Sequence, residues 1–390
     1  MRNPKAILSD GFLKKQNDKK EKGTIMNFTF ERRRMLSGFD GKECKIYPRM
    51  TVTESGTFIS YGMLLLSGSD VFQDTYFVKS TDGGQTFGAP EKLYRLETRQ
   101  NGIRTIFSPS TEYYSKYHKK WFVFGRNTSY EHEKHPILLG GISIGEAKYI
   151  LRDGKTGHYV GEMKPLPLAF DYISATPHAQ IVEYENGDFL LTFYVTPKGE
   201  IKSKALSVRY HYENGELSIV QTGELLAFPE AARGLDEPSV AKYGEKYYMT
   251  LRTDEQGLMS VSADGFVFST PVPWRWDDGS ILQNYNTMQR WIRHEGALYL
   301  AYTRKGANND HVFRHRAPIF MAKFDPERLC LIRSSEVILV PELGARLGNF
   351  TVTEISDQEF WLLTAEWMQP VGCEKYGSDN SIWIAKIRFE

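Results

Sequence analysis

The stretch at residues 80–87 reads Ser80-Thr81-Asp82-Gly83-Gly84-Gln85-Thr86-Phe87. Its short polar side chains can hydrogen-bond the backbone of a tight turn, and its two glycines can adopt positive φ. A shortened version, Ser262-Ala263-Asp264-Gly265 followed by Phe268, recurs later in the chain. Both copies follow a strand-like run and precede a proline. We therefore expect each to be a structural turn at the outer edge of a small sheet, away from any site of catalysis.

Short apolar and aromatic runs, separated by turn residues, fill the chain from about Phe28 onward. Most have the length and the Val, Ile, Tyr and Phe content of β-strands. Turns such as Glu185-Asn186-Gly187 separate neighbouring runs, as hairpins require. The runs fall into six groups, near residues 44–95, 100–160, 170–227, 234–275, 288–340 and 346–390. This spacing predicts an all-β six-bladed β-propeller that occupies residues 27–390 as a single domain, with a pair of β-sandwiches as the alternative.

Composition and charge exclude several classes of function. The formal net charge is +1, so nucleic acid is not an expected partner. No run of 18 apolar residues occurs, and we expect no membrane association. Three widely spaced cysteines offer neither a disulfide framework nor metal-ligand spacing, and no cofactor is expected. Residues 1–26 are polar and lysine-rich, which predicts a disordered tail without a secretory signal, and hence a cytoplasmic protein unless a leader has been removed.

The turn at residues 80–87 has the Asp-box pattern, and from Cys44 to Ile387 the chain resembles sialidase-like proteins of the Asp-box superfamily. Longer stretches are similar to bacterial proteins described as exo-alpha-sialidases, at residues 233–239, 284–289, 303–318 and 344–350. The resemblance implies a six-bladed propeller. It also implies an exo-acting glycoside hydrolase that removes a terminal acidic sugar, of the sialic acid type, from a glycan.

Three arginines are implied to hold the carboxylate of such a sugar, because guanidinium binds carboxylate through two parallel hydrogen bonds. Arg49 stands where the family's first arginine precedes the first blade, and Arg252 ends a strand as the second arginine does. Arg316 fits the third, with Arg314 and Arg304 as local alternatives. A structural ion pair is the simpler interpretation of any one of them.

The resemblance also implies a general acid, in a loop ahead of the first Asp box, and a glutamate that activates a nucleophile. Asp70 is favoured as the acid because Ser67-Gly68-Ser69-Asp70 has the composition of an exposed loop, and Asp74 stays open as the alternative. Either carboxylate could instead cap a turn. Glu237, in Leu235-Asp236-Glu237-Pro238-Ser239, matches the glutamate, although an ion pair with Arg233 would also explain it.

The nucleophilic tyrosine of the family is not found at its expected place. That position reads Leu347-Gly348-Asn349-Phe350, which contains no phenol. Tyr285 could substitute from another blade, although a core aromatic is the simpler interpretation. Alternatively, a water molecule positioned by Glu237 or Gln289 attacks the sugar directly, which would invert its configuration.

Two histidines are further candidates for binding the substrate. His178 precedes a strand and is expected to point into the central cavity, and His315 lies beside Arg316 in the sequence. The sequence leaves two other functions open. One is a propeller-fold polysaccharide lyase, or another glycosidase, that acts on uronate-containing glycans. The other is a propeller that binds an acidic glycan without cleaving it.

Overall fold

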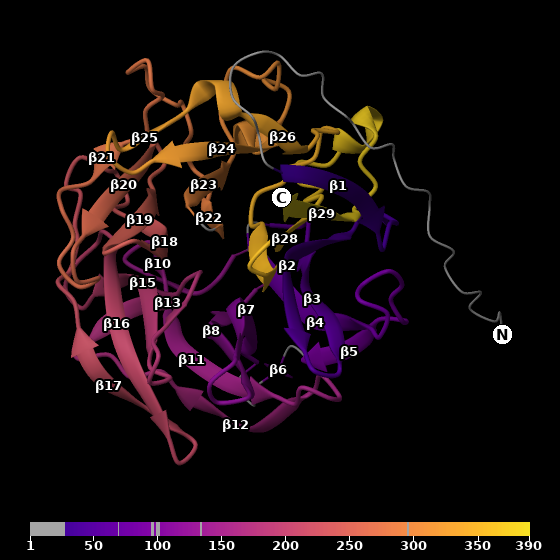
Figure 1. Ribbon diagram of the computed structural model, residues 1–390. Coiled ribbons are helices and arrows are strands. Elements are labelled where there is room, and N and C mark those ends of the chain that lie inside the picture. The colour runs from indigo at the N-terminus through magenta and orange to yellow at the C-terminus, as the bar shows by residue number, and fades with distance from the viewer. Residues whose placement is uncertain (1–27, 69, 95–96, 99–101, 133–134, 295) are drawn as a thin grey trace.

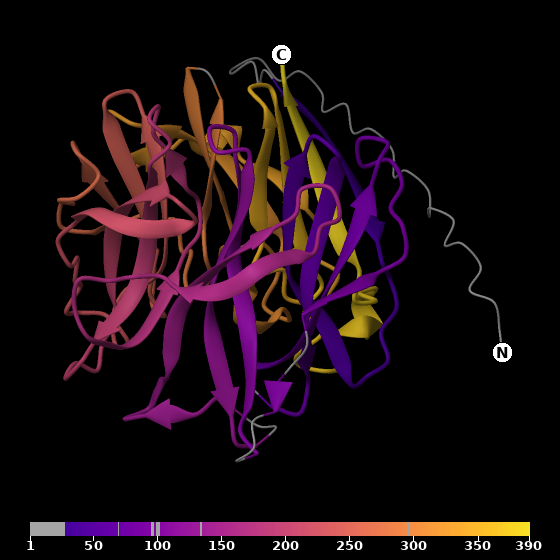
Figure 2. The ribbon, with the colours of Figure 1, turned by 90° about the horizontal axis from the view of Figure 1, so that it is seen from below.

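The strands form six antiparallel blades in a closed ring in the computed structural model, which describes residues 28–68, 70–94, 97–98, 102–132, 135–294 and 296–390 (Figure 1). Blades two and three are joined into one ten-stranded sheet by a parallel contact between Gly145 and Ser174. This arrangement confirms the six-bladed β-propeller. The tail predicted for residues 1–26 lies outside the described residues. The strands of each blade stand side by side along the ring when the molecule is turned (Figure 2). None of the helices in the described part of the chain is long and apolar enough to cross a membrane.

The first three blades are made as follows. Blade one contains β2 (Glu43–Thr53), β3 (Gly56–Leu65), β4 (Val71–Ser80) and β5 (Glu91–Tyr94). Blade two contains β7 (Arg104–Ser115), β8 (Lys120–Tyr130), β11 (Gly145–Arg152) and β12 (Tyr159–Pro165), with β6 (Glu97–Thr98) beside β7 and the small hairpin β9 (Leu138–Leu139) and β10 (Ile142–Ser143). Blade three contains β13 (Tyr172–Pro177), β15 (Phe189–Pro197), β16 (Lys204–Glu213) and β17 (Glu216–Thr222), with β14 (Val182–Glu183) beside β15.

The other three blades complete the ring. Blade four contains β18 (Asp236–Tyr243), β19 (Lys246–Arg252), β20 (Gly257–Ser262) and β21 (Val272–Pro273). Blade five contains β22 (Arg290–His294), β23 (Ala297–Tyr302), β24 (Ile319–Asp325), β25 (Cys330–Leu331) and β26 (Val337–Val340). Blade six contains β27 (Thr351–Ser356), β28 (Glu359–Ala365), β29 (Ile382–Phe389) and β1 (Phe28–Met35). Short 3₁₀ turns lie at Phe313–His315, Arg333–Ser335 and Cys373–Tyr376.

The ring is closed by β1, the first described strand. It pairs antiparallel with β29 along its whole length, from Phe28 opposite Phe389 to Met35 opposite Ile382. Figure 1 shows the two strands, from opposite ends of the chain, lying together in blade six. Because the outer strand of the last blade comes from the start of the chain, the backbone hydrogen bonds between the two ends hold the ring shut.

The apolar core is divided among the interfaces between blades. A separate cluster of buried side chains lies between each blade and the next, including one between blades six and one. Four of the largest fully buried side chains are tryptophans: Trp121, Trp274, Trp291 and Trp383. Successive apolar residues of a strand point to opposite faces of its sheet, so each blade packs against both of its neighbours. Burial of this apolar surface stabilises the ring.

The two Asp-box turns occupy the same place in their blades, between the third and fourth strands. In the first, the Asp82 carboxylate accepts hydrogen bonds from the backbone N–H groups of Gln85 and Thr86 at 2.9 Å. In the second, Asp264 does the same for Phe266 and Val267. Both carboxylates thus accept hydrogen bonds within their own turns, which agrees with a structural role.

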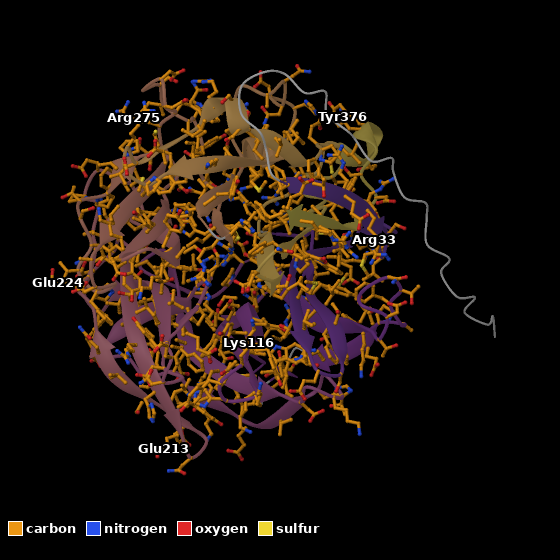
Figure 3. The ribbon with its side chains drawn as sticks, viewed as in Figure 1. Arg33, Lys116, Glu213, Glu224, Arg275 and Tyr376 are labelled. Atoms are coloured by element: carbon orange, nitrogen blue, oxygen red, sulfur yellow. The ribbon has the colours of Figure 1, made fainter. Side chains whose placement is uncertain are left out.

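The first Asp-box turn also connects blade one to blade six. Gly84, at φ +75°, lies against the indole of Trp361 in β28. Its carbonyl oxygen accepts a hydrogen bond from Arg33 of β1, which is labelled in Figure 3. A Cβ at Gly84 would lie 2.4 Å from the Trp361 ring, whereas a Cβ at Gly83, at φ +70°, meets nothing within 4 Å.

Gly84→Ala is therefore expected to destabilise the propeller by about 2–4 kcal/mol, the sum of a left-handed backbone and an overlap with Trp361. Gly83→Ala places alanine in a left-handed backbone conformation without any overlap, and is expected to lower the free energy of unfolding by about 1 kcal/mol. Urea unfolding of the two variants would measure the difference. Equal losses of stability would show that the turn does not pack against blade six as described.

Candidate active site

A cavity of about 550 Å³ lies where the blades converge, and residues from all six blades line it. Its charged and aromatic lining contains six arginines, three carboxylates and several rings: Arg126, Arg233, Arg252, Arg314, Arg316, Arg346, Asp70, Asp236, Glu237, His135, His178, Tyr47, Tyr194 and Trp367. Arginines outnumber carboxylates two to one. The cavity is therefore suited to an anionic molecule.

Glu237 is the buried carboxylate of this cavity, with only 8% of its surface exposed. It lies near the start of β18, at φ 48°, where the pairing of β18 with β19 shifts register. The Nη1 atom of Arg252 lies 2.9 Å from its Oε2 atom. Burial opposes ionisation of Glu237, but the charge of Arg252 in particular, with that of Arg316, outweighs it and lowers the pKa of this carboxyl to about 2. Glu237 is thus ionised in the free protein and can accept a proton there.

Asn286 brings three arginines together. Its Oδ1 atom accepts hydrogen bonds from Arg252 at 3.2 Å, Arg314 at 3.1 Å and Arg316 at 2.7 Å. The backbone oxygen of Asn286 also accepts from Nε of Arg316 at 2.9 Å. An amide oxygen is neutral, so it orients the three guanidinium groups without cancelling their charge.

Arg316, which is 4% exposed, is affected by the uncompensated positive charge of the neighbouring arginines. Burial, followed by repulsion from Arg252 and lesser repulsion from Arg346 and Arg314, lowers the pKa of Arg316 to about 9. Neither Arg314 nor Arg316 forms an ion pair with a carboxylate of the described residues. A bound anion would relieve this repulsion, which is the arrangement expected of a site that awaits a negatively charged ligand.

Arg346 extends the positive wall toward Asp70. Its guanidinium stacks on Trp367, 3.9 Å from the ring centre, and donates to Gln369 Oε1 at 2.8 Å. Burial lowers the pKa of Arg346 to about 10, although the charge of Asp70 opposes this. Asp70 itself lies at φ 55°, and its backbone carbonyl accepts a hydrogen bond from the Tyr130 hydroxyl at 2.8 Å.

Tyr47 places a phenol in the same cavity. It sits on β2 at φ 50°, within a bulge that shifts the pairing of β2 and β3 between Ile46 and Arg49. Burial raises the pKa of Tyr47, and the charges of Asp70 and Glu237 raise it further. The phenol is therefore protonated and has both carboxylates as electrostatic neighbours.

Backbone strain is concentrated around the cavity. Five of its lining residues have positive φ although none is glycine: Tyr47, Asp70, Glu237, Arg314 and Asn349. Each such conformation costs about 1–3 kcal/mol. Tyrosine, glutamate and arginine have no intrinsic preference for it, so the surrounding structure must hold them there. Strain of this kind typically marks a functional site.

Five of the side chains predicted from the sequence line the cavity: Asp70, His178, Glu237, Arg252 and Arg316. His178 is 4% exposed, and burial, together with the charge of Arg290, holds its pKa well below the usual value. It is therefore a neutral imidazole. The functional roles of these five residues stay predictions.

Six other predicted side chains do not line the cavity. Arg49 is buried behind Tyr47, where its Nε donates to the Ser110 carbonyl at 2.8 Å. Asp74 forms an ion pair with Lys92. Arg304 forms one with Glu336, 2.6 Å apart, in blade five. Arg49, Asp74 and Arg304 thus lie outside the lining of this cavity, and their functional roles stay predictions.

The remaining three lie close by but behind its wall. The Tyr285 hydroxyl and His315 Nδ1 are 2.7 Å apart and contact each other rather than the cavity. Gln289 is 2% exposed, and its nearest hydrogen-bond acceptor is the Leu251 carbonyl at 3.4 Å. Tyr285 therefore does not line this cavity, whereas Tyr47 and Tyr194 do.

The sequence analysis missed Tyr47, Arg126, Arg346 and the organising role of Asn286, and it named Arg314 only as an alternative. Tyr47 stood two residues before Arg49, but the bulge that separates their directions has no sequence signal that we recognised. No group of three or more His, Cys, Asp or Glu side chains in the described ranges could hold a metal ion.

No protein-family model and no curated protein matches the sequence of this chain. Solved structures match its fold. A sialidase from Trypanosoma rangeli matches with a TM-score of 0.57 at 12% identity, covering 92% of this chain and 56% of that one. The NanB sialidase of Streptococcus pneumoniae matches at 0.58 and 10%, covering 87% and 68%. An alpha-L-arabinofuranosidase from Fusarium graminearum matches at 0.51 and 13%, covering 90% and 94%.

The chain spans less than two thirds of the trypanosomal structures that it matches. At 10–13% identity the likeness concerns the fold, and the names of these neighbours include enzymes for an acidic and for a neutral sugar. The chain has the sialidase-like six-bladed β-propeller fold, which sialidases share with other glycosidases.

Proposed function

We propose that this protein is a glycoside hydrolase that removes a terminal acidic sugar, of the sialic acid type, from a glycan. The observation that carries the proposal is the pairing of an ionised Glu237 with arginines that Asn286 gathers but does not neutralise. A neutral sugar would leave those guanidinium groups buried without a counter-charge. A sugar carboxylate would supply it.

In this proposal Arg314 and Arg316 bind the sugar carboxylate. Arg252 lies between these two arginines and Glu237. Arg252 already pairs with Glu237, 2.9 Å away, and with Asp254, 3.6 Å away. It therefore holds Glu237 in place while its neighbours bind the substrate. Guanidinium groups that converge from blades four and five fix both the position and the orientation of the sugar ring.

Asp70, Tyr47 and Glu237 then carry out the chemistry. The Tyr47 oxygen attacks the anomeric carbon while Glu237 takes the phenol proton, and Asp70 gives its proton to the departing glycosidic oxygen. The bond to the leaving group breaks as the bond to Tyr47 forms. Water then attacks the same carbon and gives a proton to Asp70, while the bond between that carbon and the Tyr47 oxygen breaks and Glu237 returns its proton to the phenol oxygen.

A phenol suits this substrate better than a carboxylate nucleophile does. The anomeric carbon of an acidic sugar of this type lies beside its carboxylate, which would repel an attacking carboxylate. Because burial and the charge of Glu237 raise the pKa of Tyr47, a free phenolate is disfavoured. Proton transfer to Glu237 must therefore accompany the attack.

The test is hydrolysis of an umbelliferyl α-sialoside by the purified protein, followed by fluorescence of the released aglycone. The matching α-L-arabinofuranoside, which carries no charge, serves as the control substrate. We expect release from the sialoside only. Preferential release from the arabinofuranoside would contradict the proposal, as would an unsaturated uronate product from a uronate polysaccharide. Glycan retention without any product would instead indicate a binding protein.

A further inference from the structure

Arg126 gives the cavity a second cationic wall, away from Asn286. It lies on β8 in blade two, whereas the arginines bound to Asn286 come from blades four and five. Its guanidinium donates to the hydroxyls of Ser174 at 3.0 Å, Thr176 at 3.4 Å and Ser143 at 3.1 Å. No carboxylate of the described residues forms an ion pair with it.

The surroundings of Arg126 are built to hold it in place. Gly145 lies against its side chain, and a Cβ there would be 2.8 Å from Arg126 Cδ. Gly145 pairs with Ser174 where β11 meets β13, so Arg126 rests on the junction of blades two and three. The hydroxyls of Ser143 and Ser174 accept from Arg126, and each keeps its own O–H to donate to an anion.

The cavity also has more positive charge than one carboxylate can use. Arg314 and Arg316 suffice for a sugar carboxylate, since a carboxylate offers two oxygens. Arg346 and Arg126 remain. Arg346 stacks on Trp367 and donates to Gln369, whereas Arg126 lies on another side of the cavity. Its guanidinium uses three of its five N–H groups on neutral hydroxyls.

Arg126 is connected to the proposed acid through Tyr130. Tyr130, four residues along the same strand, donates its hydroxyl to the backbone carbonyl of Asp70 at 2.8 Å. Burial raises the pKa of Tyr130, and both Arg126 and Asp70 are among its electrostatic neighbours. Because Asp70 would protonate the glycosidic oxygen, a group bound by Arg126 belongs to the sugar that leaves.

We propose that Arg126, with the hydroxyls of Ser143 and Ser174, binds a second anionic group on the leaving sugar, either a sulfate ester or a second carboxylate. This rests on the proposed hydrolase function and narrows its substrates to glycans in which the penultimate sugar is also acidic. Two anions held at opposite walls would orient the glycosidic bond between them.

The experiment compares three ligands: a sialyl-galactoside, the same disaccharide with a sulfate ester on its galactose, and a dimer of two sialic acids. Dissociation constants are measured by calorimetry in a Glu237→Gln background, which prevents turnover. Hydrolysis by the otherwise wild-type protein is measured separately. We expect at least one of the two doubly charged ligands, the sulfated disaccharide or the sialic acid dimer, to bind about 10- to 100-fold tighter than the plain disaccharide.

Arg126→Ala is expected to remove this preference, and Arg126→Lys to restore part of it. Gly145→Ala, which displaces the guanidinium without removing its charge, is expected to weaken it. Arg275→Ala is the matched control, because Arg275 lies on the outer edge of the ring and donates to the Gly279 carbonyl (Figure 3). It should leave the preference as it is.

The outcomes separate the two proposals. The second anionic site would be overturned if the parent protein bound all three ligands equally, or if Arg126→Ala weakened the binding of all three by the same factor. Hydrolysis of the plain disaccharide would still uphold the enzyme in that case. A preference that depends on Arg126 without any hydrolysis would uphold the anionic site and overturn the enzyme. Failure to bind any of the three ligands would overturn both.

Discussion

Glu237→Gln is expected to lower kcat for a sialoside by about 10³-fold, while KM changes by no more than about threefold. The amide is nearly the same size as the carboxylate, so the substitution removes the proton acceptor and its charge but little volume. Arg252 would then lack its closest partner, 2.9 Å away. Without this carboxylate, the charge of Arg252 does not weaken binding of the sugar carboxylate. The loss of activity should therefore appear in kcat rather than in KM.

Glu336→Gln is the matched control. It breaks a carboxylate–guanidinium pair of similar burial, to Arg304 at 2.6 Å, but outside the cavity. Steady-state kinetics on both variants would separate loss of the base from loss of an ion pair. A Glu237→Gln enzyme that retained wild-type kcat would end the assignment of Glu237.

The pH dependence of Glu237 has a definite sign. Its folded pKa, about 2, lies below the value near 4.3 that a glutamate has in an unfolded chain. Its ionised form therefore stabilises the folded protein above about pH 4.3, and this contribution is lost as the pH falls toward 2. Protonation of Glu237 should accordingly not limit turnover at mildly acidic pH.

The fold could be predicted because its signals are local. The Asp-box turn needs only hydroxyls, a carboxylate and glycines within eight residues, and alternating apolar runs mark the strands. The pairing of β1 with β29 was not predicted, because it joins residues more than 340 positions apart and leaves no short-range pattern. Closure of the ring is thus a property of the whole chain.

The candidate site was predicted in part, because five of the predicted side chains line the cavity. Glu237 lies at the start of β18 and Arg252 at the end of β19, so the antiparallel pairing brings them together at the open end of this hairpin. Arg49 was expected in the cavity, but the bulge in β2 breaks the alternation of sides and brings Tyr47 there. Similarly, the positive φ of Arg314 lets it reach Asn286 alongside Arg316, which no spacing rule would indicate.

Tyr47→Phe is expected to lower kcat by about 10³-fold, because it removes the proposed nucleophile and leaves the ring in place. The ring packs on Phe72 and under Arg49, so stability should change little. NMR of the sugar as it is released would show retention of configuration in the wild-type protein.

Tyr285→Phe removes the same hydroxyl from a phenol behind the cavity wall, where it contacts His315, and is expected to keep kcat within about threefold of wild type. If Tyr47→Phe kept its rate and the wild-type product were inverted, water would be the nucleophile and Glu237 its base. That outcome would preserve the arginines and the acidic sugar while reassigning Tyr47 to positioning. Retention together with loss of kcat in Tyr47→Phe alone would place the covalent bond on the phenol that the β2 bulge turns into the cavity.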